Sequence, residues 1–226
     1  MKNLVITIDG PAGSGKSTTA KLVAKRLGLL YLDTGAMYRA IALKALMKGI
    51  DLEDERSLEN LANDTQIDVI PDPDGCRVIM DGEDVSERIR THEVSQASSK
   101  VSAVRGVRRR LIEIQRRIGA AGGIVAEGRD IGSVVFPDAD IKIYLDADIE
   151  TRTLRRMKDM ERSGEQIPFE KVKEDIQRRD KQDSSRQLSP LIVPEGAKII
   201  DTSNLSIEEQ VEKVLDEVRR RLEKNN

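Results

Sequence analysis

The feature that most constrains this chain is a glycine-rich loop near its start, between a predicted strand and a predicted helix. The loop matches the pattern G-x-x-x-x-G-K-[ST]. An apolar, β-branched run at 4–9 precedes it, and a helical pattern at 16–27 follows it and stops at Gly28. The backbone N–H groups of such a loop can surround a phosphate at the positive end of the helix. We call it the phosphate loop, and its residues are Gly10, Pro11, Ala12, Gly13, Ser14, Gly15, Lys16, Ser17 and Thr18.

Two side chains of the phosphate loop have specific predicted roles. Lys16 is expected to reach the β- and γ-phosphates of ATP, and the Ser17 hydroxyl is expected to be a ligand of Mg²⁺. The alternative is a plain glycine turn whose lysine is a solvated surface charge. The strand, loop and helix in sequence favour the nucleotide site.

The rest of the chain alternates between apolar runs of strand length and amphipathic segments of helix length. The runs at 4–9, 29–33, 123–127, 141–146 and 198–201 have the length expected of strands buried on both faces. Helices are predicted at 16–27, 35–48, 93–103, 107–120, 149–162, 169–182 and 206–224. This alternation predicts an α/β fold with a five-stranded parallel sheet flanked by helices.

One segment, 66–86, breaks the alternation. Short apolar stretches lie on either side of Asp72-Pro73-Asp74-Gly75, and Asp81-Gly82 follows the second stretch. Asp-Gly steps between such stretches are typical of tight turns in antiparallel hairpins. We therefore predict a small antiparallel β insertion beside the acceptor site.

Composition excludes several kinds of site. With 38 basic and 40 acidic residues and 2% aromatics, the chain offers neither a global basic field nor many stacking platforms for nucleic acid. Cys76 is the only cysteine and His92 the only histidine, so an internal disulfide is excluded and a His/Cys metal site is disfavoured. No run of eighteen apolar residues occurs. We expect no nucleic-acid partner, no membrane partner and a cytoplasmic location.

Proteins with a phosphate loop of this kind include small-molecule kinases and nucleotide-dependent switches. A guanine-reading switch needs an Asn-Lys-x-Asp segment, which the sequence lacks. A kinase needs cations around the transferring phosphoryl group. Arg129 follows a predicted buried strand, Arg39 lies in the second helix, and Asp183 and Arg186 are spaced to share a helical face. The kinase interpretation is therefore favoured over the switch.

Taken together, these residues make the chain resemble the bacterial cytidylate kinases, of the nucleoside monophosphate kinase group. The resemblance runs nearly from end to end. It rests on Ile-Asp-Gly-Pro at 8–11, Tyr-Leu-Asp-Thr-Gly-Ala-Met-Tyr-Arg at 31–39, Glu-Gly-Arg-Asp at 127–130, Val-Phe-Pro-Asp-Ala at 135–139, the segment 179–186 and Ser-Pro-Leu at 189–191.

The resemblance implies transfer of the γ-phosphate of ATP to CMP or dCMP with Mg²⁺, by a monomeric enzyme. It also implies three regions in one kinase unit: a core at 1–34, 121–151 and 190–226, an acceptor-binding region at 35–120, and a helical lid at 152–168. A broader pyrimidine kinase acting on UMP as well as CMP is the alternative within this class.

Residue roles follow from the same resemblance. Lys16, Arg129, Arg156 and Arg186 are the expected catalytic residues, and Arg155 is expected to approach the ATP phosphates. Ser99, Arg108 and Asp130 match the cytosine readers, Arg179 and Asp183 the sugar contacts, and Arg39, Arg129 and Arg186 the clamp on the acceptor phosphate. Thr34 and Tyr38 complete the expected CMP site. Simpler roles remain open: Asp130 could pair with Arg129, and Ser99 could be a hydroxyl on a helix surface.

Overall fold

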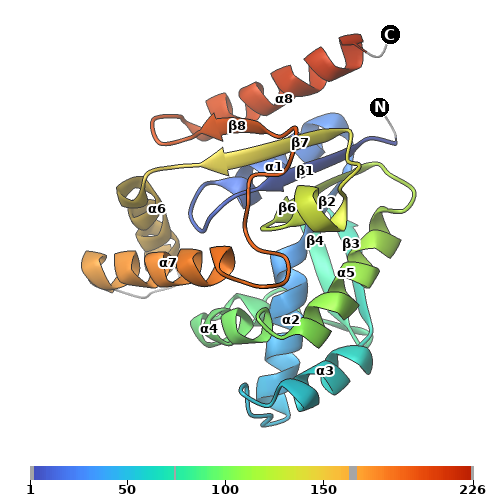
Figure 1. The fold of residues 1–226 in the computed structure, drawn as a ribbon, viewed down its shortest axis with the longest axis vertical. Coiled ribbons are helices and arrows are strands. Elements are labelled where there is room, and N and C mark those ends of the chain that lie inside the picture. The colour runs from blue at the N-terminus through green and yellow to red at the C-terminus, as the bar shows by residue number, and fades with distance from the viewer. Residues whose placement is uncertain (1–2, 74, 163–166, 225–226) are drawn as a thin grey trace.

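The computed structural model describes residues 3–73, 75–162 and 167–224, which form a central sheet covered by helices (Figure 1). The sheet has five strands in the order β2-β6-β1-β7-β8, and every neighbouring pair is parallel. Their bounds are β1 Val5–Asp9, β2 Leu30–Asp33, β6 Ile124–Gly128, β7 Ile141–Asp146 and β8 Lys198–Asp201. The predicted five-stranded parallel sheet is therefore confirmed.

Helices cover both faces of this sheet and bury a separate apolar cluster on each. Helices α1, Lys16–Leu27, and α8, Ile207–Lys224, lie over the face that carries Ile6, Ile8 and Ile143. Helices α2, Thr34–Met47, α4, His92–Val101, and α5, Arg105–Gly119, enclose the larger cluster on the other side. Figure 1 shows α8 along the β7–β8 side of the sheet and α2, α4 and α5 at the opposite end of the molecule. All five helices correspond to predicted ones, with ends that differ by at most two residues.

The predicted insertion is also confirmed as a small antiparallel sheet. Its strands are β3 Ile67–Asp72, β4 Gly75–Met80 and β5 Glu83–Asp84, in that order. Ile67, Val78 and Met80 point into the larger cluster, so the sheet buries one face and leaves the other exposed. Asp74, in the predicted turn, lies outside the described residues.

Three short elements were not predicted. Helix α3, Glu55–Asn63, is amphipathic and buries Leu58, Leu61 and Ala62, while the Asp54 side chain accepts from the backbone of Ser57. Helix α3 is only nine residues long, which is below the length of about ten to twelve residues at which an apolar pattern distinguishes a helix from other short segments. A 3₁₀ turn, η1, covers Arg88–Arg90, and a π-helical turn, η2, covers Ile131–Val135.

Helices α6, Ile149–Arg162, and α7, Phe169–Ser184, lie next to each other at one side of the molecule (Figure 1). They pack on each other through a small cluster of their own, built on Met160, Val172 and Ile176. Residues 163–166, inside the segment expected to be a lid, lie outside the described residues. Within the described ranges, every helix is too short or too polar to cross a membrane.

Candidate active site

The phosphate loop joins the end of β1 to the start of α1. Gly10, Gly13 and Gly15 have φ angles of 152°, 78° and 91°, which side chains rarely adopt, so glycine is required at these turns. The buried Lys16 opens α1, and its Nζ donates to the Pro11 carbonyl oxygen at 2.9 Å. Burial, and next the charge of Arg129, lower the pKa of Lys16 to about 7. The loop therefore holds its lysine in a buried site beside Arg129 that disfavours the charged form, and the nearby Glu127, Asp183 and Asp9 offset this only in part.

Gly13 also lies where the phosphate loop meets α6. A Cβ at this position would lie 2.8 Å from the Arg152 carbonyl oxygen. We expect Gly13→Ala to lower the free energy of unfolding by about 1–3 kcal/mol, measured by urea denaturation, and to weaken ATP binding. Gly28→Ala is the matched control, because Gly28 has a φ of 65° with open space around it. It should cost about 1 kcal/mol and leave ATP binding unchanged; equal effects of the two changes would contradict this account.

The Ser17 hydroxyl faces a carboxylate from the neighbouring strand. It donates to Glu127 Oε1 at 2.7 Å, and Glu127 is buried at the end of β6. Burial, together with the negative charge of Asp33, raises the pKa of Glu127. A hydroxyl and a carboxylate at the carboxyl edge of the sheet are oxygen ligands of the type that Mg²⁺ prefers. Sequence analysis included Glu127 in the segment 127–130 of the resemblance but assigned it no role at the metal.

A second buried carboxylate connects β1 to the loop that follows β6. The two oxygens of Asp9 accept from the backbone N–H groups of Ile131 and Gly132, each at 2.8 Å. Burial raises the pKa of Asp9 to about 6 despite these bonds. Because Arg129 and Asp130 directly precede this anchored turn, Asp9 fixes the backbone from which both side chains project.

Arginines from several elements gather beyond the strand ends. Arg129 Nε donates to Asp183 at 2.8 Å, and Arg39 donates to Asp33 at 2.8 Å. Burial and the charge of Arg129 lower the pKa of Arg179 to about 10, and Arg156 and Arg39 add to this effect. The structure therefore brings Arg39, Arg129, Arg156 and Arg179 within electrostatic reach of one another.

The three residues expected to read the base do not all meet directly. Arg108 and Asp130 form a buried ion pair at 2.5 Å, with side chains 2% and 6% exposed. The Arg108 guanidinium also lies 5.3 Å from the centre of the Tyr38 ring and donates to the Ser102 carbonyl oxygen. Asp130 thus pairs with Arg108, and the simpler alternative of an Arg129 partner is not what the structure has, because Arg129 pairs with Asp183.

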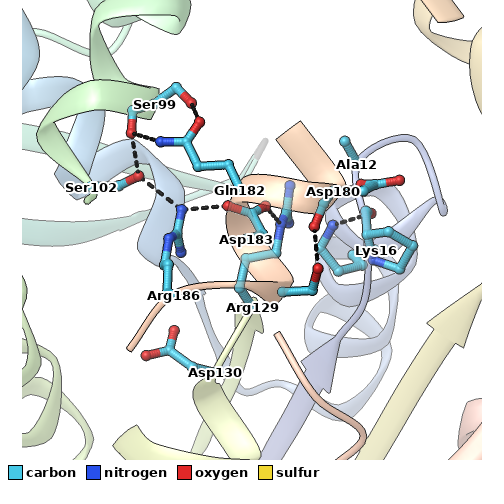
Figure 2. A network of polar contacts seen from close by, with 12 residues as sticks. Ala12, Lys16, Ser99, Ser102, Arg129, Asp130, Asp180, Gln182, Asp183 and Arg186 are labelled. Carbon is cyan, nitrogen blue, oxygen red and sulfur yellow. Dashed lines mark hydrogen bonds and ion pairs between the residues drawn. The ribbon is translucent and has the colours of Figure 1, made fainter. Parts of the chain in front are cut away.

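Ser99 belongs instead to a contact between α4 and α7, drawn in Figure 2. Its hydroxyl donates to Gln182 Oε1 at 2.9 Å, and Gln182 Nε2 donates back to the Ser99 carbonyl oxygen at 3.1 Å. Arg186 pairs with Asp183 and donates to the Ser102 hydroxyl at 3.0 Å. Burial acts to raise the pKa of Asp183, but the charges of Arg129 and Arg186 together lower it. Helix α7 and the residues that follow it therefore connect Ser99 of α4 and Ser102, just after α4, to Arg129.

Helix α6 contacts the phosphate loop through two arginines. Arg155 donates to the carbonyl oxygens of Gly13 and Thr202, at 3.4 and 2.6 Å. Arg152 donates to the Ala12 carbonyl oxygen at 3.2 Å and pairs with Asp180 of α7. Sequence reasoning singled out Arg155 but not Arg152, whose position one turn into the helix after β7 was the available signal.

Thr34 has a structural contact as well as its expected ligand role. Its buried hydroxyl donates to the Glu127 carbonyl oxygen at 2.8 Å, and a Cβ on Gly128 would lie 2.6 Å from that hydroxyl. The Thr34 side chain thus holds the start of α2 against the end of β6, at the same edge of the sheet as the phosphate loop.

In sequence, the chain matches both a family model and individual known proteins. A family model described as cytidylate kinase matches residues 6–220. A protein named cytidylate kinase from Caldanaerobacter subterraneus subsp. tengcongensis is 49% identical over 215 residues, covering 95% of this chain and 94% of that protein. The cytidylate kinase of Bacillus subtilis (strain 168) is 46% identical over 220 residues, covering 97% and 98%.

Among solved structures, the similarity concerns the fold. A gluconokinase from Sinorhizobium meliloti 1021 superposes with a TM-score of 0.50 at 13% identity, covering 97% of this chain and 93% of that chain. An uncharacterized protein from Eubacterium ventriosum ATCC 27560 gives a TM-score of 0.51, also at 13% identity. At this level of identity, the shared property is the arrangement of strands and helices.

Proposed function

The chain belongs to the cytidylate kinase family, and from that premise we propose that this protein transfers the γ-phosphate of ATP to CMP or dCMP, giving ADP and CDP or dCDP. The observation that carries this proposal is the set of cations around the phosphate loop. Burial and the charge of Arg129 lower the pKa of both Lys16 and Arg179. Phosphates bound between these groups would remove the mutual repulsion and stabilise the charged side chains.

Catalysis then rests on positioning and on charge. In the transition state of phosphoryl transfer, negative charge is spread over the equatorial oxygens of the transferred group. Lys16 lies in the phosphate loop, where ATP would bind. Arg129 and Arg186 both pair with Asp183 and lie beside the proposed acceptor site. The acceptor phosphate oxygen is already anionic, so attack in line with the leaving group needs no protein base. Arg156, from α6, completes the proposed catalytic cations.

The residues at the phosphate loop fit a bound Mg²⁺. The Ser17 hydroxyl would be its ligand, and the Glu127 carboxylate beside it, 2.7 Å from Ser17 Oγ, would hold the ion or one of its waters. When bound, Mg²⁺ neutralises charge on the β- and γ-phosphate oxygens. The protein supplies the hydroxyl, the buried acid and the backbone N–H groups that orient the same phosphates.

The acceptor site is proposed on the side of α4 and α5. Asp130 would accept from the N4 amino group of cytosine, and Arg108 would donate to N3 or O2. Arg179 and Asp183 would contact the sugar, while Arg39, Arg129 and Arg186 would clamp the phosphate. Uracil has a carbonyl in place of the amino group and would face the Asp130 carboxylate unfavourably.

The proposed lid is the segment 152–168, which includes most of α6 and contributes Arg155 and Arg156 to the ATP side. Helix α6 packs on α7 through a small apolar cluster that is separate from the two large ones, and this separation supports movement of the lid. Closure would exclude water and so limit hydrolysis of ATP. The division into core, acceptor region and lid stays a prediction, as do the monomeric state and the cytoplasmic location.

The experiment that tests this proposal measures ADP release from ATP and Mg²⁺, first without acceptor and then with CMP, dCMP, UMP, AMP and GMP separately. We expect release to depend on CMP or dCMP. Comparable turnover with UMP would indicate the broader pyrimidine kinase. Release that does not depend on any monophosphate would contradict the proposed function and favour a nucleotide switch.

A further inference from the structure

Helices α4 and α7 are joined by two hydrogen bonds between the Gln182 side chain and Ser99, one in each direction. Gln182 of α7 donates through Nε2 to the backbone carbonyl oxygen of Ser99, at 3.1 Å, and accepts through Oε1 from the Ser99 hydroxyl, at 2.9 Å (Figure 2). A carbonyl oxygen can only accept, so the nitrogen of the amide must be the atom that faces it. The orientation of the Gln182 amide is therefore fixed by chemistry and leaves its oxygen for the hydroxyl.

The hydrogen bonds of Arg186 and Ser102 are consistent with this assignment of donors and acceptors. Arg186 can only donate, so the Ser102 hydroxyl accepts from it at 3.0 Å. Ser102 then gives its own proton to the Ser99 carbonyl oxygen at 2.9 Å. Both lone pairs of that carbonyl are thus used, by Ser102 Oγ and by Gln182 Nε2. The network from Arg186 to Ser99 has one consistent set of donors and acceptors.

This network decides what Ser99 can offer to a ligand. A hydroxyl has one proton and two lone pairs, and the proton of Ser99 is committed to Gln182. The half-buried Ser99 side chain therefore presents only acceptor capacity to a group that approaches it. Without Gln182 the hydroxyl would rotate freely and could donate or accept with equal ease.

The difference matters because cytosine and uracil differ at C4 in hydrogen-bond polarity. An amino group at C4 donates, whereas a carbonyl at C4 accepts and would meet a lone pair of Ser99. We propose that Gln182 is a positioning residue that sets the selectivity of the acceptor site, by holding the Ser99 hydroxyl as an acceptor for the amino group of an aminopyrimidine monophosphate. The inference rests on the proposed function and on Ser99 facing the base, and it adds a residue of α7 that acts through Ser99.

The test compares kcat/KM for CMP with kcat/KM for UMP in the full-length protein. Gln182→Ala should lower the CMP/UMP ratio by about tenfold, the factor that corresponds to one ordinary hydrogen bond. The matched control is Gln177→Ala, because Gln177 is an exposed glutamine on the same helix. That variant should keep the ratio of the wild type.

Two further variants separate polarity from simple packing of α7 on α4. Gln182→Glu can still accept from the Ser99 hydroxyl, but its second carboxylate oxygen faces the Ser99 carbonyl oxygen and repels it, so this variant should keep more of the CMP/UMP ratio than Gln182→Ala but less than wild type. In a Ser99→Ala background, Gln182→Ala should change the ratio no further.

The outcomes are distinguishable. Equal losses for CMP and UMP in Gln182→Ala, or a further change of the ratio in the Ser99→Ala background, would overturn the role of Gln182 while the wild type remained a CMP kinase. A wild-type protein without preference for CMP would overturn the proposed function itself. Circular dichroism of each variant checks that the fold is intact before the ratios are compared.

Discussion

A Lys16→Met variant is expected to fold and to lose roughly a hundred- to a thousandfold in kcat, the range seen when one preorganised charge-stabilising group is removed from a site. Lys16 is buried at the start of α1 and lies close enough to Arg129 for the charge of Arg129 to lower its pKa. Methionine keeps the length and apolar stem of lysine but removes the cation. The measurement is steady-state ADP release with saturating ATP and CMP.

Lys16→Met should lower activity but should not lower stability at pH 7, because the buried site disfavours the lysine charge there. The difference in the free energy of unfolding between wild type and variant should depend on pH. The pKa of Lys16 is about 7 in the folded protein, against 10.5 as its ordinary value. Between these two pH values the unfolded chain binds more protons at this group than the folded chain, so the contribution of Lys16 to stability rises with pH. The stability of wild type relative to Lys16→Met should therefore increase from pH 7 to pH 10, followed by urea denaturation.

Lys25→Met is the control for both measurements, because Lys25 lies on the same helix and is exposed. It should keep normal turnover and show no such pH trend against wild type. Full turnover by Lys16→Met would show that the lysine of the phosphate loop takes no part in catalysis. A flat stability difference between pH 7 and pH 10 would show that the folded environment does not disfavour the charge of Lys16.

The sequence was most informative where a local structure requires particular residue types at particular positions. The phosphate loop needs glycines at fixed turns, and a buried parallel strand must be an apolar run, so both were predictable. Strand order could not be read from the chain: β6 lies between β2 and β1 although some ninety residues of sequence separate it from β2. Helix α3 was missed because it is only nine residues long, below the length at which an apolar pattern distinguishes a helix from other short segments.

The sequence predicted which residues belong to the candidate site better than it predicted which of them pair with one another. Asp130 and Arg129 are adjacent in sequence, yet Asp130 pairs with Arg108 of α5 and Arg129 with Asp183 of α7. Such pairings depend on how distant elements meet, which no local pattern encodes. Gln182 lies in the segment 179–186 of the resemblance but had no role assigned to it, and its contact with Ser99 emerges only when α4 and α7 are brought together.

The second large effect is expected at the buried pair of Arg108 and Asp130. Asp130→Val should lower the free energy of unfolding by about 3–5 kcal/mol, because it leaves the Arg108 guanidinium buried without its counter-charge. Arg108→Met should cost a similar amount, since it strands the Asp130 carboxylate. Both single variants should also lose most of their kcat/KM for CMP. Urea denaturation and steady-state kinetics measure the two effects separately.

The double variant Arg108→Met with Asp130→Val separates the structural role of the pair from its proposed role in reading the base. Removing both charges avoids the uncompensated one, so the double variant should recover much of the stability lost by either single change. It should recover no CMP activity, because methionine and valine offer neither the donor nor the acceptor that the cytosine edge requires. If kcat/KM for CMP returned together with stability, the pair would be a packing element of α5 and the loop after β6, and base reading would have to be assigned to other residues.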